Sequence, residues 1–426
     1  MFEFDKSEIR LNHPFTQNLL SGFNLFCDVG LYFALNGLEA GGGKPSSQQA
    51  ASTTNCILFA VLAFTGLFGG VVINNIGPKW LLVGTRLTVW IQINHPVESQ
   101  LHPTVHVCLW ITVGAPITFG IVNGNQTTGG VSNAVYATFI VITALPTLTS
   151  LLFIKDPKEL RLSDGSDIAP FESGTVWEEL KGIAELFKDP KIMLMVPPML
   201  AIQVLLASQP SINAHYFNVR TRALNNIRFW GVQWITTAAM QSTLNNKGLN
   251  RQARGISVYI FLTCLVVGVW VGELVWLRAH QAPHLSDGPG WDWTDAEFGS
   301  FIVIHLFQGM LYWIFIQWEI GALSNSPHLL ARYSGLLKAC LAGRTCIVFG
   351  VDSGLPPFEY VVAWNFGLQG CAMCILVYIC GFQITVTNYG KEDDVIIPSY
   401  DDAIIEAASG NITVIPSLKE TVTSKQ

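Results

Sequence analysis

The sequence predicts an all-α membrane protein with about ten transmembrane helices, because of its composition and the lengths of its apolar stretches. Half of the 426 residues are hydrophobic and only 13% are charged, whereas about 25% of the residues of an ordinary soluble domain are charged. Its apolar stretches reach the roughly 20 residues that a helix needs to cross the hydrocarbon core of a bilayer. A lipid bilayer is therefore the expected surrounding. The net charge of -6 comes without a basic stripe, so no nucleic-acid partner is expected.

Four apolar stretches come before a charged central segment and six come after it. The first half, residues 1–154, is expected to cross the bilayer at 15–38, 53–76, 105–122 and 134–154. The central loop, residues 155–191, has apolar positions at helical spacing over 176–187, which predicts an amphipathic helix lying against the membrane or the bundle, or a plain linker helix. The second half, residues 192–387, is expected to cross at 192–212, 227–244, 256–276, 298–323, 336–351 and 358–387. Residues 388–426 are predicted to be an acidic, largely disordered tail.

An even number of spans places both termini of this multi-pass protein on one side of the membrane. Lys and Arg residues gather in the central loop and in the loop 245–255, so the positive-inside rule predicts that this side is the cytoplasm. The arginines Arg220, Arg222 and Arg228 fall on the opposite side and count against this orientation. Asn125 begins an Asn-Gln-Thr triplet on the expected outer side, which makes it a candidate glycosylation site.

A glycine-rich turn at 70–79, after the second span, is a candidate cytoplasmic gate with Gly70, Asn74, Gly77 and Lys79 as its residues. Glycines let a membrane helix approach a neighbour closely. Asn74 and Lys79 can hydrogen-bond and pair across a gate that opens and closes. The alternative is a plain glycine-rich turn at the membrane boundary.

Polar residues of the first span fall on one face, within an arc of roughly 120° at 100° per residue. They include Asn24, Asp28 and Tyr32. Polar groups within spans are costly in lipid and normally face a protein interior or a water-filled cavity. We therefore expect a cavity lining with Asp28 as a proton or cation site, or else a hydrogen-bonded helix contact with a neutral Asp28.

The second half carries further candidates for the cavity lining. His305, Tyr312 and Glu319 share an arc of about 60°, and Glu319 is expected near the cytoplasmic end, where an interfacial carboxylate is ordinary. Arg344 lies in the middle of its span. A guanidinium at this depth is expected to seek Asp28, Glu319 or a backbone carbonyl.

Enzyme signatures are not met, and neither a metal nor a cofactor is expected. The Gly-Gly-Gly-Lys-Pro string at 41–45 lacks the first glycine and the Ser/Thr of a phosphate-binding loop. The histidine pairs 102/106 and 280/284 have helical ligand spacing but lie in proline-bearing segments that are not expected to be helical.

The turn at 70–79 resembles the signature loop of the major facilitator superfamily, with asparagines at 74 and 75 where the commoner pattern has an acid and a base. Longer strings are similar to the fungal Unc-ninety-three-like branch of that superfamily. They are Ala-Leu-Asn-Gly-Leu at 34–38, Tyr-Phe-Asn-Val-Arg-Thr-Arg-Ala-Leu-Asn-Asn at 216–226, Gly-Ala-Leu-Ser-Asn at 321–325 and Ala-Arg-Tyr-Ser-Gly at 331–335. The resemblance implies a major facilitator type helical bundle that moves a small solute or ion by alternating access. Animal relatives are linked to ion-channel regulation and receptor trafficking, which implies an alternative, a non-transporting scaffold with a membrane-protein partner.

The sequence departs from the six-plus-six arrangement of this family. The third and fourth spans are missing between Lys79 and Val105, so 4 + 6 helices are expected instead of 12. Loss of two spans would leave the membrane orientation of all later spans unchanged. It would also remove one wall of the central cavity. A third possibility is therefore that the chain is the inactive product of a truncated gene model.

Overall fold

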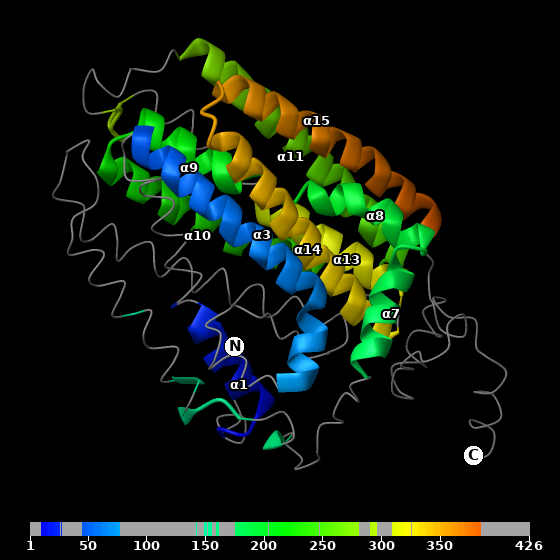
Figure 1. The fold of residues 1–426 in the computed structure, drawn as a ribbon. Helices are drawn as coiled ribbons and strands as arrows, with labels where there is room; N and C mark the ends of the chain where they lie inside the picture. Colours follow the sequence, from blue (N-terminus) through cyan, green and yellow to red (C-terminus); the bar gives the residue numbers. More distant parts are fainter. Residues whose placement is uncertain are drawn as a thin grey trace, which may run out of the picture.

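The computed structural model describes residues 10–25, 27, 45–76, 142, 149–150, 152–155, 159–161, 175–202, 204–246, 248–280, 290–295, 309–324 and 326–384. Within these residues the chain is a bundle of helices, as the sequence predicts (Figure 1). The α-helices are α1 (Pro14–Leu25), α3 (Pro45–Ile76), α7 (Val176–Leu186), α8 (Pro190–Leu200), α9 (Leu205–Tyr216), α10 (Val219–Leu244), α11 (Arg251–Ala279), α13 (Gly309–Leu323), α14 (Pro327–Asp352) and α15 (Phe358–Tyr378). A short π-helical segment, η4 (Ile379–Gln383), continues α15.

Four helices of the described part are long and apolar enough to cross a membrane, namely Gln49–Phe68, Arg251–Ala279, Leu329–Asp352 and Phe358–Gln383. They overlap the expected spans at 53–76, 256–276, 336–351 and 358–387. The third and fourth expected spans lie almost entirely outside the described residues, and so does the polar stretch between Lys79 and Val105.

Several helices begin earlier than their apolar stretches because polar caps lie in front of them. The Asn218 side chain accepts a hydrogen bond from the backbone N–H of Thr221, so α10 begins eight residues before the expected 227. Asn250 caps α11 in the same way by accepting from the N–H of Ala253. Hydropathy detects the part of a helix that faces lipid, whereas capping decides where the backbone hydrogen bonds start.

The expectation of one continuous span at 192–212 is wrong. The segment is two helices, α8 and α9, separated by non-helical backbone at Ala201–Val204, where residue 203 is not described. Pro197 and Pro198 lie in the last turns of α8. A proline has no N–H to donate and crowds the preceding turn, so two in succession weaken the backbone hydrogen bonding of α8 next to the break.

Close packing holds the second half together. Trp270 of α11, Phe315 of α13 and Met195 of α8 are fully buried in one cluster. The Trp270 indole N–H donates to the Gln369 side-chain oxygen of α15 at 2.7 Å. Lipid is as apolar as these side chains, so dispersion contacts and hydrogen bonds of this kind stabilise the bundle.

The two halves of the chain meet where α3 packs along α14, a contact that we call the α3–α14 seam (Figure 1). Gly66 lies so close to α14 that a Cβ atom placed on it would stand 3.3 Å from Lys338 Cβ and from the backbone nitrogen of Ala339. Further along, the rings of Phe59 and Phe349 stack with centroids 5.6 Å apart. Small residues at such contacts let helix backbones approach closely in a membrane.

Helix α7 of the central loop is present over the predicted range and packs against α3 and α14 at one end of the bundle (Figure 1). A capping box starts it, because Thr175 and Glu178 hydrogen-bond each other's backbone N–H groups. Arg332 of α14 lies over Gly182 and reaches Glu179 at 4.0 Å. The Tyr333 hydroxyl donates to Asp189 at 2.6 Å. Helix α7 therefore packs against the bundle, which is one of the expected placements.

Candidate functional site

The break between α8 and α9 exposes backbone carbonyls inside the bundle, and side chains of other helices bind them. The Tyr312 hydroxyl of α13 donates to the Pro198 carbonyl oxygen at 3.2 Å. The Asn365 amide of α15 donates to the Val204 carbonyl oxygen at 3.4 Å. Each unsatisfied backbone group costs several kcal/mol in hydrocarbon, so irregular backbone at membrane depth needs such partners. Tyr312, expected to line a cavity, therefore has a buried role at the break.

Arg344 of α14 reaches the same break. Its side chain is 2% exposed, and Nη2 donates to the Asn365 side-chain oxygen. The guanidinium also lies over the Trp364 ring, 4.7 Å from the ring centroid. Among the described residues, no carboxylate lies within ion-pair distance of Arg344, and its Nε has no hydrogen-bond partner.

The partner of Arg344 is therefore not Glu319, one of the groups that the sequence suggested. The guanidinium instead reaches a backbone carbonyl indirectly, through Asn365 to Val204. Asp28, the other suggested partner, lies outside the described residues.

Glu319 of α13 is buried within the bundle. Its side chain is 0% exposed, and Oε1 accepts a hydrogen bond from the Cys380 thiol at 2.9 Å. Oε2 has no hydrogen-bond partner among the described residues. A buried carboxylate with one free oxygen is costly unless it is protonated or a cation comes to it.

Asn24 forms a helix contact, which is the alternative that the sequence left open. Its amide nitrogen donates to the Ser150 hydroxyl at 3.0 Å, and its amide oxygen accepts from the Thr149 hydroxyl. Two turns earlier, the Gln17 side chain donates to the carbonyl oxygen of Phe153 at 3.0 Å. These bonds join α1 to the end of the fourth expected span.

The other predicted site residues lie at the end of α3 or outside the described residues. Gly70 and Asn74 lie in the last turns of α3, whose side chains are not described there. Those outside the described residues are Asp28, Tyr32, Gly77, Lys79, Asn125 and His305.

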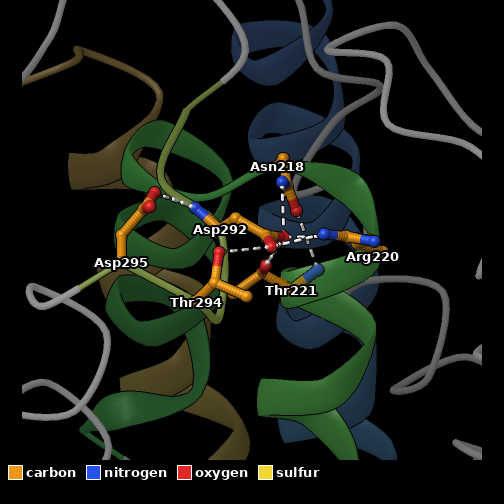
Figure 2. Close-up of polar contacts among 6 residues, drawn as sticks. All are labelled: Asn218, Arg220, Thr221, Asp292, Thr294 and Asp295. Atoms are coloured by element: carbon orange, nitrogen blue, oxygen red, sulfur yellow. Dashed lines mark hydrogen bonds and ion pairs between the residues drawn. The ribbon is translucent and has the colours of Figure 1, made fainter.

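The end of the bundle opposite α7 is fastened by a cluster around Asp292 that the sequence did not reveal (Figure 2). Asp292 Oδ1 accepts from Arg220 Nε at 2.7 Å, from the Asn218 amide at 2.8 Å and from the Thr221 hydroxyl at 3.0 Å. Oδ2 accepts from Arg220 Nη2 and from the Thr294 hydroxyl. The loop 290–295 is thereby tied to the start of α10. Hydrogen bonds from Arg220 hold the pKa of Asp292 well below its ordinary value, with smaller contributions from Asn218, Thr221 and Thr294.

Two of the three arginines that count against the predicted orientation, Arg220 and Arg222, have local hydrogen-bond partners. Asp292 neutralises Arg220, and the Arg222 Nε donates to the backbone oxygen of Phe217 at 2.6 Å. Backbone bonds from Asn218 and Trp291 pair the same two segments. Gly290 permits this pairing, since a Cβ atom there would lie 2.8 Å from the Tyr216 carbonyl oxygen. The only signal in the sequence was an Asp-Trp-Thr-Asp string in a polar loop.

Asp352, at the last residue of α14, is a second buried group that sequence reasoning missed. Its Oδ2 accepts from the Ser52 hydroxyl of α3 at 3.0 Å and from the Ser211 hydroxyl of α9 at 2.9 Å. One carboxylate thus joins the first half of the chain to both α9 and α14. It closes the α3–α14 seam at the end away from α7.

Comparison with known proteins gives a consistent result, although no protein-family model matches the chain. An uncharacterized membrane protein of Schizosaccharomyces pombe is 31% identical over 89% of this chain and 85% of its own length. UNC93-like protein 1 of Arabidopsis thaliana is 25% identical over 90% of this chain and 94% of its own length. A second S. pombe relative, also an UNC93-like protein, is 26% identical over 89% of this chain and 84% of its own length.

The fold is similar to that of a solved transporter. The crystal structure of a bacterial homologue of the iron transporter ferroportin, in an outward-facing state, matches with a TM-score of 0.50. The match covers 87% of this chain and 100% of that chain at 12% identity, so the likeness concerns the fold alone. Together, the relatives and the helical bundle confirm the family that the sequence motifs indicated. The chain belongs to the UNC93-like family of membrane proteins and has a transporter fold of the major facilitator type.

Proposed function

We propose that the chain moves a small solute or ion across a membrane by alternating access between its two halves, with the α8–α9 break as part of the solute path. The observation that carries this proposal is the broken helix together with the buried Arg344 and Asn365 beside it. Transporters commonly place their sites where a membrane helix is discontinuous, because the freed backbone groups and the half-helix ends can bind a solute.

The α3–α14 seam is the surface at which the halves would move against each other. Its contacts include small residues, two thiols, one stacked ring pair and, at the end away from α7, the hydrogen bond from Ser52 to Asp352. Transport by rocking requires such a surface, since one end of it must open while the other stays closed.

Glu319 is the described residue best suited to couple transport to a proton or a cation. It is fully buried, and one carboxylate oxygen has no partner among the described residues. Asp28 is a second coupling candidate, and the gate residues Asn74 and Lys79 would act at the α7 end. We assign that end to the cytoplasm, because Lys181, Lys188, Lys191 and Arg332 gather there.

The test is flux into vesicles that contain the purified full-length chain, with a panel of small anions, cations and neutral solutes. Arg344→Gln should lower the flux of the transported solute at least about tenfold if the guanidinium contributes roughly 1.4 kcal/mol or more to binding in the path. Arg278→Gln is the matched control, because Arg278 lies on the exposed last turn of α11. Equal flux for the two variants would remove Arg344 from the path. A folded, reconstituted chain with no flux for any solute would favour the scaffold or the inactive-product alternative.

A further inference from the structure

The α3–α14 seam brings two thiols from different halves of the chain into contact. Cys56 of α3 and Cys346 of α14 are 290 positions apart, yet their sulfur atoms are 3.5 Å from each other. The stacked rings of Phe59 and Phe349, one turn along each helix, flank the pair. The two cysteines therefore face each other because of how the helices pack, and not because of proximity in the sequence.

The local packing leaves the sulfur atoms little distance to close. A disulfide bond is about 2.05 Å long, so the sulfur atoms must approach by roughly 1.5 Å. Small residues already bring the helices together on both sides of the pair. A Cβ atom on Gly350 would stand 3.5 Å from the Cys56 sulfur, and one on Gly343 would stand 3.9 Å from Ala63 Cβ. A disulfide bond here requires rotation of the two cysteine side chains and a small shift of the helices.

Partial exposure combined with sulfur–sulfur contact distinguishes this pair from the other described cysteines. Both Cys56 and Cys346 are half-buried, so a small oxidant can reach them. Cys340 and Cys380 are buried, and the Cys380 thiol donates to Glu319. The remaining exposed cysteines, Cys264, Cys371 and Cys374, lie on the outer faces of α11 and α15.

We propose that Cys56 and Cys346 form a reversible disulfide bond that ties the first half of the chain to the second. With a peroxide as oxidant, both S–H bonds break and one S–S bond forms. The two electrons from the sulfur atoms cleave the O–O bond of the peroxide, which takes up both protons and leaves as two molecules of water when it is hydrogen peroxide. A dithiol reverses the reaction by thiol–disulfide exchange and becomes a disulfide itself.

The bond would hold α3 in one register on α14. If the halves move as proposed above, the oxidised chain is locked and the reduced chain is free. This consequence rests on the proposed function, whereas formation of the bond does not.

The bond is tested with a protease site inserted into the full-length chain between residues 162 and 174 of the central loop. After treatment with hydrogen peroxide and cleavage, the two halves should run as one band on a non-reducing denaturing gel and separate after a dithiol is added. Peptide mapping of the unaltered, oxidised chain should find Cys56 and Cys346 in one disulfide-linked pair of peptides. The proposal is overturned if the halves separate without reductant while both thiols still react with a maleimide.

Matched variants establish which thiols react. Cys56→Ser and Cys346→Ser should each abolish the linked band, while Cys264→Ser should leave it unchanged. A linked band that persists in Cys346→Ser would contradict the assignment.

Flux is then measured in vesicles before and after oxidation. If the halves are linked and flux is undiminished, the disulfide bond forms but does not stop transport. Absent flux in the reduced chain would count against the proposed function and not against the disulfide bond.

Discussion

Substituting Gly66 with valine is expected to weaken the contact between the two halves more than any change of equal size on the lipid-facing surface. A Cβ atom at Gly66 would lie 3.3 Å from Lys338 Cβ and from the Ala339 nitrogen, whereas carbon atoms pack best at about 3.5–4.0 Å. The contacting atoms belong to backbone and to the root of a side chain, so they cannot swing aside. The helices must therefore separate by several tenths of an ångström for the Cβ alone, and further for the two methyl groups of valine.

The magnitude follows from the steepness of dispersion contacts. A gap of about 0.5–1 Å forfeits a quarter to a half of the attraction between facing atoms. Overpacking of well-packed interiors costs about 1–3 kcal/mol. In domains of about 150–250 residues, each kcal/mol lowers the midpoint of thermal unfolding, Tm, by roughly 2–4 °C. We expect Gly66→Val to lower the Tm by several degrees.

The assay is thermal unfolding of the purified chain in detergent, followed by tryptophan fluorescence. Gly268→Val is the matched control, because nothing lies within 4 Å of a Cβ atom at Gly268 in the middle of α11. Gly343→Ala should be nearly neutral, since its Cβ atom would make an ordinary contact of 3.9 Å with Ala63. Equal Tm values for Gly66→Val and Gly268→Val would refute the close approach of α3 to α14.

Three further outcomes are expected. Arg220→Gln should lower the Tm at pH 7, and its difference in Tm from the unmodified chain should shrink as the pH falls below about 4. The lowered pKa of Asp292 gives a stabilisation that is present above the unfolded pKa of about 3.9 and is lost on acidification. Arg278→Gln should show no such trend in the same scan. Tyr312→Phe removes the side-chain donor of the buried Pro198 carbonyl, which keeps its backbone donor Ala201, and should cost about 0.5–1.5 kcal/mol in unfolding free energy. Amide hydrogen exchange should speed up around Ala201–Val204, and an unchanged exchange rate would show that the break does not need Tyr312. Gly182→Ala should displace the Arg332 guanidinium, which would lie only 2.1 Å from the new Cβ atom, and should loosen the packing of α7. The Tm should change little, because the atoms that the new Cβ atom meets are the end of a flexible side chain, and a large fall in Tm would contradict this.

The features that hydropathy and local chemistry encode could be predicted from the sequence. The bundle of membrane helices follows from long apolar stretches, and α7 follows from its helical spacing. The break at Ala201–Val204 was also signalled, by Pro197 and Pro198 within an otherwise apolar stretch. Hydropathy averages over such a stretch and does not register the missing backbone donors, so the span was predicted as continuous.

Contacts between distant segments could not be predicted, because they depend on which faces of two helices meet. Asn24 was placed on the correct polar face, but whether that face meets a cavity or a neighbouring helix depends on the packing with Ser150. Asp292 and Arg220 are 72 residues apart, and nothing local marks them as partners. The same holds for Cys56 and Cys346.

The most direct test of alternating access measures distances across the α3–α14 seam at both of its ends. Spin labels on Thr54 and Leu355 report one end, and labels on Phe64 and Ala331 report the α7 end, all in a chain without other reactive cysteines. Alternating access predicts two distance populations at each end, with the longer distance at one end accompanying the shorter at the other as pH or solute is varied. A single narrow distance at both ends under every condition would contradict movement of the halves, and with it transport by this fold.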